Sequence, residues 1–339
     1  MQTKASFIKR AFPVPRALIL SDVSIDISDG VLRYFEVASS KGELRPKAYG
    51  SEEVARFHRG VKDEKTVALV ADSLKAFSAK TGYQAVKAIV HEGDAYVFKL
   101  KVPTVRLDEI RPAIESALEE NVPIAPSDAL VEYDIVSVDQ AKKETVVSVS
   151  VLSEKIVSEF VRILEMGNLV PVSIETESRA IARAVISPDD TKTHVILSIK
   201  AHHSIVFVVE RGKVTFSSSI EVGAADLEKA QSKAEDTTET KLFEAMIPVF
   251  ATIRDEISKV VVYHKTEAKK QGISGDFEDI ILLGSSSKIP GFVRYVSLAT
   301  KLPTKIGSVW TNIISPAQEI PDLDESKSLD YGSLIGAHL

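Results

Sequence analysis

The sequence contains the same strand-rich pattern twice, and this repeat limits the possible folds more than any other feature. The first copy covers residues 17–37, where Ser28, Asp29 and Gly30 form a turn sequence between two apolar runs. The second copy covers residues 194–220, with three apolar runs separated by turn residues. Apolar runs of this length between turn residues predict antiparallel hairpins. Because strands and helices follow each copy, we expect a duplicated α/β protein with two lobes.

The segments between and after the repeats predict six regions. A helix that carries Ile110, Ile114 and Leu118, with Pro112 in its first turn, and two strands at 130–138 and 145–151 indicate an inserted α+β subdomain. The polar stretch 229–240 is expected to be a solvated loop or a frayed helix start before a long helix from 241 to about 270. The predicted regions are a flexible tail (1–16), the first part of lobe one (17–102), the inserted subdomain (103–151), the rest of lobe one with a connecting helix (152–190), lobe two (191–325) and a C-terminal helix that returns to lobe one (326–339).

Composition excludes several classes of protein. The chain has 339 residues and is 44% hydrophobic, so it is long enough for more than one core and too apolar for general disorder. The absence of cysteine excludes disulfides, zinc–thiolate sites and thiol nucleophiles. A net charge of -6 argues against a general nucleic-acid binder. No apolar run is long enough for a membrane span, and Pro13 and Pro15 interrupt the start of the chain, so we expect an intracellular protein without a signal peptide.

Six segments, in order, resemble the PilM-type actin-like proteins of type IV pilus assembly, which are related to FtsA, actin and Hsp70. The first hairpin has an acidic residue at the end of a strand, a small turn, and a basic residue in the next strand. Residues 103–126 are similar to the family's inserted subdomain, and LEMGNLVPVSI-ETESRA (164–180) to its connecting strand and helix. Residues 194–209 resemble the second phosphate hairpin, LLGSSSKIPG (282–291) the adenosine-binding loop, and 332–337 the closing helix.

The resemblance implies an actin-like (ribonuclease-H-like) fold and a nucleotide site between the lobes, with ATP and Mg²⁺ as cofactors. Asp26 is then the metal ligand, and Glu177 is the catalytic carboxylate that orients water. The residues implied to contact the cofactor are Asp26, Ser28, Asp29, Gly30 and Arg33 of the first hairpin, Ser198, Lys200 and Ser204 of the second hairpin, and Gly284, Ser285, Ser286, Ser287 and Lys288 of the loop.

The second hairpin departs from the family pattern. It has Ser198, Ile199 and Lys200 where relatives usually carry Asp-Ile-Gly, which removes a carboxylate for the metal and a glycine that lets the backbone approach a phosphate. Asp29 adds a negative charge that would repel phosphate without a metal between them. We therefore expect nucleotide binding with weak or no hydrolysis, and lean against an enzyme.

Each of these residues also has a structural interpretation. Asp26 can bond its own turn, and Glu177 can be an early-helix acid that the helix dipole favours. Lys200 can meet a phosphate as a point charge or lie exposed in its turn, and we expect the exposed position. The loop at 284–288 can be a plain strand-to-helix connection. His202 and His203 are not expected to bind a metal, because neighbours in a strand point to opposite faces and no third ligand lies at the usual spacing.

The resemblance further implies a scaffold at the inner face of the cell membrane. Its partners would be the cytoplasmic tail of a PilN-like inner-membrane protein and the pilus motor ATPases. The tail would bind beside the inserted subdomain, in a groove formed by the helix at 107–119 and the strands at 130–138 and 96–102. Two alternatives share the fold. An FtsA-like cell-division protein usually ends in an amphipathic membrane helix, whereas this chain stops at Leu339. The other alternative is an active ATPase or sugar kinase. A sugar kinase would need a catalytic aspartate in its sugar cleft, and the sequence offers no candidate for it.

Overall fold

A computed structural model describes residues 22–40, 43–55, 63–103, 107–234, 236–270, 274–314 and 323–339. The tail expected at 1–16 and the apolar run at 17–20 lie outside these ranges. Within the described ranges, no helix combines the length and the apolar character needed to cross a lipid bilayer.

Two five-stranded sheets have the same topology. Their strand orders are β3-β2-β1-β4-β8 and β11-β10-β9-β12-β13, and in both sheets the first three strands are antiparallel and the last two are added in parallel. The first sheet contains β1 (Val23–Ser28), β2 (Val31–Ser40), β3 (Glu43–Glu53), β4 (Ala85–Val90) and β8 (Val170–Thr176). The second contains β9 (Thr193–Ile199), β10 (Ser204–Glu210), β11 (Lys213–Ile220), β12 (Asp279–Leu283) and β13 (Thr304–Ile306). The predicted duplicated two-lobed α/β fold is confirmed.

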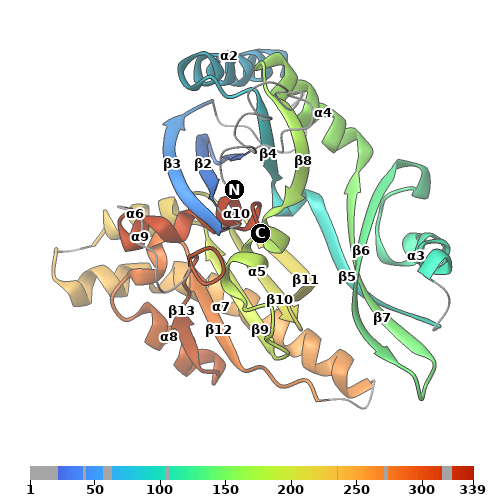
Figure 1. Cartoon of the computed structure of the whole chain (residues 1–339). Helices are drawn as coiled ribbons and strands as arrows, with labels where there is room; N and C mark the ends of the chain where they lie inside the picture. Colours follow the sequence, from blue (N-terminus) through green and yellow to red (C-terminus); the bar gives the residue numbers. More distant parts are fainter. Residues whose placement is uncertain are drawn as a thin grey trace, which may run out of the picture.

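Helices cover the sheets in layers (Figure 1). The outer face of the first sheet packs against α2 (Glu64–Thr81) and α4 (Glu154–Met166), through apolar side chains such as Leu74 and Leu164. The outer face of the second sheet packs against α6 (Ala224–Gln231), α7 (Glu239–Lys270) and α8 (Phe292–Thr300). Between the sheets lie α5 (Glu177–Val185) and α10 (Gly332–Gly336), in a central core to which both sheets contribute. The short helices α9 (Glu325–Ser328) and η5 (Leu329–Tyr331) lead into α10.

The inserted subdomain is a three-stranded antiparallel sheet beside the two lobes (Figure 1). Its strand order is β5-β7-β6, and α3 packs on it through Ile110, Ile114 and Leu118. Because β5 pairs with β7 along its whole length, the sheet starts at Ala95, before the boundary expected at residue 103. The helix α3 begins early enough that Pro112 lies beyond its first turn, contrary to expectation. The elements are β5 (Ala95–Pro103), α3 (Leu107–Asn121), β6 (Ala129–Asp139) and β7 (Glu144–Ser153), with the short helices η2 (Glu92–Asp94) and η3 (Pro126–Asp128).

The small sheet is fixed to the second lobe by polar contacts. Lys99 of β5 lies 2.7 Å from the Glu210 carboxylate, and Lys213 of β11 lies 3.3 Å from Asp134 of β6. The hydroxyl of Ser148 donates to the carbonyl oxygen of Val214. These contacts hold the small sheet against β11, while β6 and β8 stay at the edges of their sheets.

Candidate functional site between the lobes

The first turns of the two sheets bond directly to each other. Asp29 lies between β1 and β2, and its carboxylate accepts the backbone N–H of His202 at 3.0 Å. The same carboxylate lies 3.1 Å from Nδ1 of His203, in the turn between β9 and β10. Asp29 and Gly30 both have positive φ, at 60° and 76°, as a two-residue Asp-Gly hairpin turn requires. The local turn therefore aims the Asp29 side chain at the other lobe.

Lys200 is buried between the lobes, so the expectation of an exposed lysine is wrong. Its side chain leaves the end of β9, and Nζ lies 3.0 Å from Asp26 and 3.2 Å from Glu177. Only 4% of the residue is exposed, because β1 and the start of α5 close over it. Burial acts to lower the pKa of Lys200, but the negative charges of Asp26 and Glu177 outweigh it and hold the pKa above its ordinary value. The lysine is charged inside the protein.

His203 places each of its ring nitrogens against a carboxylate. Nδ1 faces Asp29, and Nε2 lies 3.2 Å from Glu177. Burial acts to lower the pKa of His203, but Glu177 and Asp29 together raise it to about 10. Burial likewise acts to raise the pKa of Asp29, yet the bond to His203 brings it down to about 2. We call Asp26, Asp29, Glu177, Lys200 and His203 the inter-lobe cluster.

Glu177 sits at the centre of this cluster and is fully buried. One of its oxygens accepts the backbone N–H of Glu92 at 3.1 Å and faces His203, while the other lies beside Lys200. Burial acts to raise the pKa of Glu177, but the positive charges of Lys200 and His203 outweigh it and hold the pKa well below its ordinary range. A backbone donor and His203 thus take Oε2 of Glu177, while Oε1 lies in an ion pair with Lys200 and accepts no hydrogen bond.

Two further residues at the site, His91 and Glu92, were missed by the sequence reasoning. They follow β4, which runs parallel to β1. Their side chains therefore lie at the same end of the sheet as Asp26. The carboxylate of Glu92 accepts both the backbone N–H and the hydroxyl of Ser178, at 2.9 and 2.7 Å, and burial raises its pKa. An acidic residue two positions after a buried strand was the signal that could have pointed to it.

The ligand atoms of His91, Glu177 and His203 lie within 4.8 Å of one another, a spacing that a metal ion could use. Their bonds argue against it. Nδ1 of His91 accepts the backbone N–H of Gly93 at 2.9 Å, which places the proton of the neutral ring on the other nitrogen. Burial lowers the pKa of His91, so the ring is neutral, and both nitrogens of His203 already face carboxylates. These three residues fit an ion-paired cluster better than a metal site.

The structure brings the three implied nucleotide-contact segments together around the end of β9. The turn between β1 and β2 is hydrogen-bonded to the turn between β9 and β10. The loop contributes η4 (Ser285–Lys288), and Gly284, directly before it, packs against the carbonyl of Ile199 at the end of β9. A Cβ atom on Gly284 would lie 2.1 Å from that carbonyl oxygen, so the glycine is required for packing.

Many polar groups in these segments are already used within the protein. The backbone N–H of Ser285 donates to Asp330, and Lys288 pairs with Glu325 at 2.9 Å. The carbonyl oxygens of Gly30 and Ser286 accept hydrogen bonds from the backbone N–H groups of Val54 and Ile289. The hydroxyl of Ser204 donates to the carbonyl oxygen of Val222. In the described part of these segments, the hydroxyls of Ser28 and Ser287 and one guanidinium nitrogen of Arg33 are buried without a hydrogen-bond partner, and so is Oε1 of the neighbouring Glu177. Ser198 is also buried.

These contacts test whether the residues fit ATP and Mg²⁺. The ammonium group of Lys200 occupies the space between Asp26 and Glu177, where a divalent cation would need the same oxygens. The carboxylate of Asp29 takes the turn N–H of His202, which a phosphate would need. The few unpartnered hydroxyls are groups that water can satisfy. As the turns stand, they do not fit a nucleotide with its metal.

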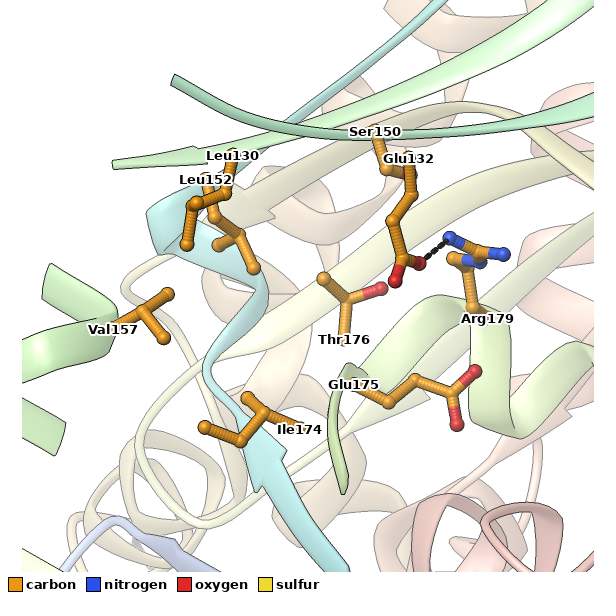
Figure 2. Close-up of a pocket in the computed structure, with 9 residues that line it drawn as sticks. All are labelled: Leu130, Glu132, Ser150, Leu152, Val157, Ile174, Glu175, Thr176 and Arg179. Carbon is orange, nitrogen blue, oxygen red and sulfur yellow. Dashed lines mark hydrogen bonds and ion pairs between the residues drawn. The ribbon is translucent and has the colours of Figure 1, made fainter. Parts of the chain in front are cut away.

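Apart from the inter-lobe cluster, a hollow lies where the small sheet meets the first lobe (Figure 2). Its volume is about 180 Å³, and its apolar wall is formed by Leu130, Leu152, Val157 and Ile174. The other lining residues are Glu132, Ser150, Glu175, Thr176 and Arg179. Arg179 of α5 pairs with Glu132 and Asp134 of β6, and this pair with Glu132 closes one side of the hollow. The hollow therefore lies between β6 and β8, whereas the groove was expected between β6, β5 and the helix α3.

No family model matches the sequence, and no curated protein matches it. Among solved structures, the chain is similar to one described as the PilM-PilN type IV pilus biogenesis complex. The TM-score is 0.72 with 18% sequence identity, over 95% of this chain and 98% of that one. It is also similar to MreB5 of Spiroplasma citri bound to ADP, with a TM-score of 0.50 and 13% identity, over 93% and 94% of the two chains. At these identities the likeness shows the fold, which is the actin-like ATPase fold.

Proposed function

We propose that the chain is a PilM-like scaffold of a type IV pilus machine, and that it binds an extended segment of a PilN-like inner-membrane protein. It would work at the cytoplasmic face of the membrane, to which this partner attaches it, with the pilus motor ATPases as further partners. The observation that carries the proposal is the hollow between β6 and β8, in a chain whose fold matches the PilM-PilN structure over nearly its whole length.

Both strands that border the hollow are edge strands. β8 ends the first sheet and β6 ends the small sheet, so each can offer backbone N–H and C=O groups to a further strand. Val170 and Val172 of β8 are 56% and 46% exposed, and Leu130 of β6 is 43% exposed. Exposed apolar side chains along an open edge suit an extended peptide, which pairs through its backbone and places alternate side chains in pockets.

The hollow itself separates apolar from polar contacts. Leu152, Val157 and Ile174 form a wall that would accept an apolar side chain of the segment. Opposite them, Glu132 is held by Arg179, so its position is set before a partner arrives. Because β6, β8 and α5 are regular elements, binding should need little rearrangement.

Nucleotide turnover has no part in this proposal. The resemblance implies ATP and Mg²⁺, and one structure of the same fold is described as bound to ADP. The inter-lobe cluster does not fit them, since Lys200 occupies the Asp26 and Glu177 oxygens and Asp29 occupies the His202 N–H. A scaffold that captures a peptide at the edge strands β6 and β8 does not depend on ATP or Mg²⁺.

Calorimetry with a synthetic peptide tests the proposal. The peptide is the cytoplasmic N-terminal tail of the inner-membrane protein encoded beside this chain. Leu130→Asp puts a charge into the hollow. Burying one leucine is worth roughly 1.5–3 kcal/mol, so the affinity should fall about tenfold or more.

Val138→Asp is the matched control, because Val138 is exposed on the same strand and does not line the hollow. It should bind the peptide like the wild type. Equal affinity for Leu130→Asp, or an equal loss in both variants, would contradict the proposed site.

A further inference from the structure

Lys200 joins the two lobes through a buried ammonium group. It directly follows β9 of the second sheet, while Asp26 belongs to β1 of the first sheet and Glu177 to the connecting helix α5. The hydroxyl of Ser333 in α10 lies 3.5 Å from the same nitrogen. Lysine is almost never fully buried unless its charge is paired. The position is therefore built for this charge from three separate elements.

The surroundings of this nitrogen have the composition of a cation site. Two buried carboxylates that converge on one point are an arrangement that holds a divalent cation. Here Nζ donates a hydrogen bond to Asp26 at 3.0 Å and lies in an ion pair with Glu177 at 3.2 Å. Mg²⁺ would require oxygens at about 2.0–2.1 Å. The carboxylates are thus spaced for an ammonium group.

Charge balance leads to the same conclusion. The three carboxylates of the inter-lobe cluster face two cations, Lys200 and the protonated His203. Arg33, which lies opposite Asp26 in the β1–β2 register, adds a third positive charge nearby. A divalent cation would add two further charges to a balanced group, so the cluster gives it little electrostatic reason to bind.

We propose that Lys200 is a built-in cation that takes the place of a divalent metal between Asp26 and Glu177. The lobes then stay closed without metal or nucleotide. The proposal goes beyond peptide binding at β6 and β8, and either can fail without the other, because the two are measured at different sites with different readouts.

The distance between the lobes tests it directly. The chain contains no cysteine, so two spin labels can be placed at Lys75→Cys on α2 and Lys259→Cys on α7, both exposed. Pulsed electron paramagnetic resonance then gives the distance distribution of the full chain. We expect the same narrow distribution without additions, with Mg²⁺, and with Mg²⁺ and ADP. A distribution that shifts or narrows when Mg²⁺ and ADP are added would overturn the proposal.

Charge removal supplies the second arm. In the labelled chain, Lys200→Met should broaden the distribution toward longer distances, while Lys229→Met, at an exposed lysine of α6 in the same lobe, should leave it unchanged. If Lys200→Met does not fold, Asp26→Asn/Lys200→Met removes both charges together and should show the same broadening. An unchanged distribution in the variant that folds would refute the role of Lys200.

Metal dependence supplies the third arm. Lys200→Ala leaves two carboxylates facing an empty space, so Mn²⁺ should raise its melting temperature. Wild type and Asp26→Asn/Lys200→Ala should not respond, since one has the ammonium group and the other lacks a carboxylate pair. A rise in the wild type with Mn²⁺, or none in Lys200→Ala, would show that Lys200 does not stand in the place of a metal.

Discussion

His203 shows how strongly the inter-lobe cluster acts on a single side chain. Its ring faces Asp29 and Glu177, and its centroid lies 4.2 Å from that of the tilted His91 ring. Burial acts to lower the pKa of His203, but the two carboxylates outweigh it, so the pKa rises from 6.5 to about 10 in the folded protein. Protonation of this ring and folding are therefore linked.

The linkage gives a pH-dependent stability with a definite sign. A raised folded pKa stabilises the protein fully below pH 6.5, and this contribution is lost as pH rises toward about 10. For one proton, the unfolding free energy should fall by at most ~1.4 kcal/mol per pH unit in that window. Urea unfolding of the wild type and His203→Gln between these pH values measures it. The variant should be less stable near neutral pH and should show a shallower decline.

His202→Gln is the control for this series, because the contact of His202 with Asp29 is made by its backbone N–H. It should keep the slope of the wild type. If the wild type and His203→Gln decline in parallel, the ring is not protonated in the way described.

At this scale, the sequence predicts which residues meet but not what they do together. Asp26, Asp29, Glu177 and Lys200 were all selected as candidates, and they do converge. Their roles could not be foreseen, because the burial of Lys200 depends on carboxylates far away in the sequence. A turn sequence contains no information about which element of the other lobe covers it.

Helix packing in the central layer depends on the absence of a side chain at one position. A Cβ atom at Gly336 of α10 would lie 1.7 Å from the carbonyl oxygen of Ala180 in α5. This carbonyl belongs to the backbone and cannot move aside as a flexible side chain can. The close contact of the two helices therefore requires glycine at this position.

Gly336→Ala should accordingly destabilise the protein, although alanine is the better helix former. Overpacking of a well-packed core costs about 1–3 kcal/mol, measured here by urea unfolding. Gly332→Ala, in the same helix, is the matched control. Its Cβ atom would lie no closer than 3.4 Å to a neighbour, so the variant should be as stable as the wild type or slightly more stable. Equal stability of the two variants would argue against the α5–α10 contact.

Among the elements, those with weak apolar patterns escaped the sequence analysis. β3 is polar and contains Pro46 and Gly50, both unusual within a strand. The structure accommodates Pro46 because β3 is an edge strand with a bulge at that point of its pairing with β2. The short strand β13 and the short helix α6 were also missed. In contrast, α7 was found nearly in full, because its apolar stripe repeats over many turns.

For the whole molecule, the strongest expectation is the absence of catalysis. Purified protein with Mg²⁺ and ATP should release phosphate at the background rate, with or without the partner peptide, because Lys200 and Asp29 occupy the groups that would activate it. A phosphate-release assay checks this. Turnover of about 1 s⁻¹, the low end for ordinary enzymes, would contradict it if Glu177→Gln abolished the activity. Glu175→Gln, which alters a neighbour paired with Arg183, serves as the control.

The overall architecture could be predicted because duplication is written into the sequence as a repeated pattern. The equivalent sheets confirm it, strand for strand. The position of the small sheet against β11 could not be foreseen, since it depends on pairs such as Lys99 with Glu210 that join distant segments.

The central layer also has a consequence for how the protein is made. The hydroxyl of Ser24 in β1 donates to the carbonyl of Leu334 in α10, 310 residues later. A ribosome therefore completes both sheets before it delivers α10, one of the two helices between them. Until then, their inner faces lack part of their core, and contacts between such distant segments form slowly. The growing chain should therefore pass through a stage that needs protection from aggregation. A chain that made this helix early in synthesis would avoid that stage.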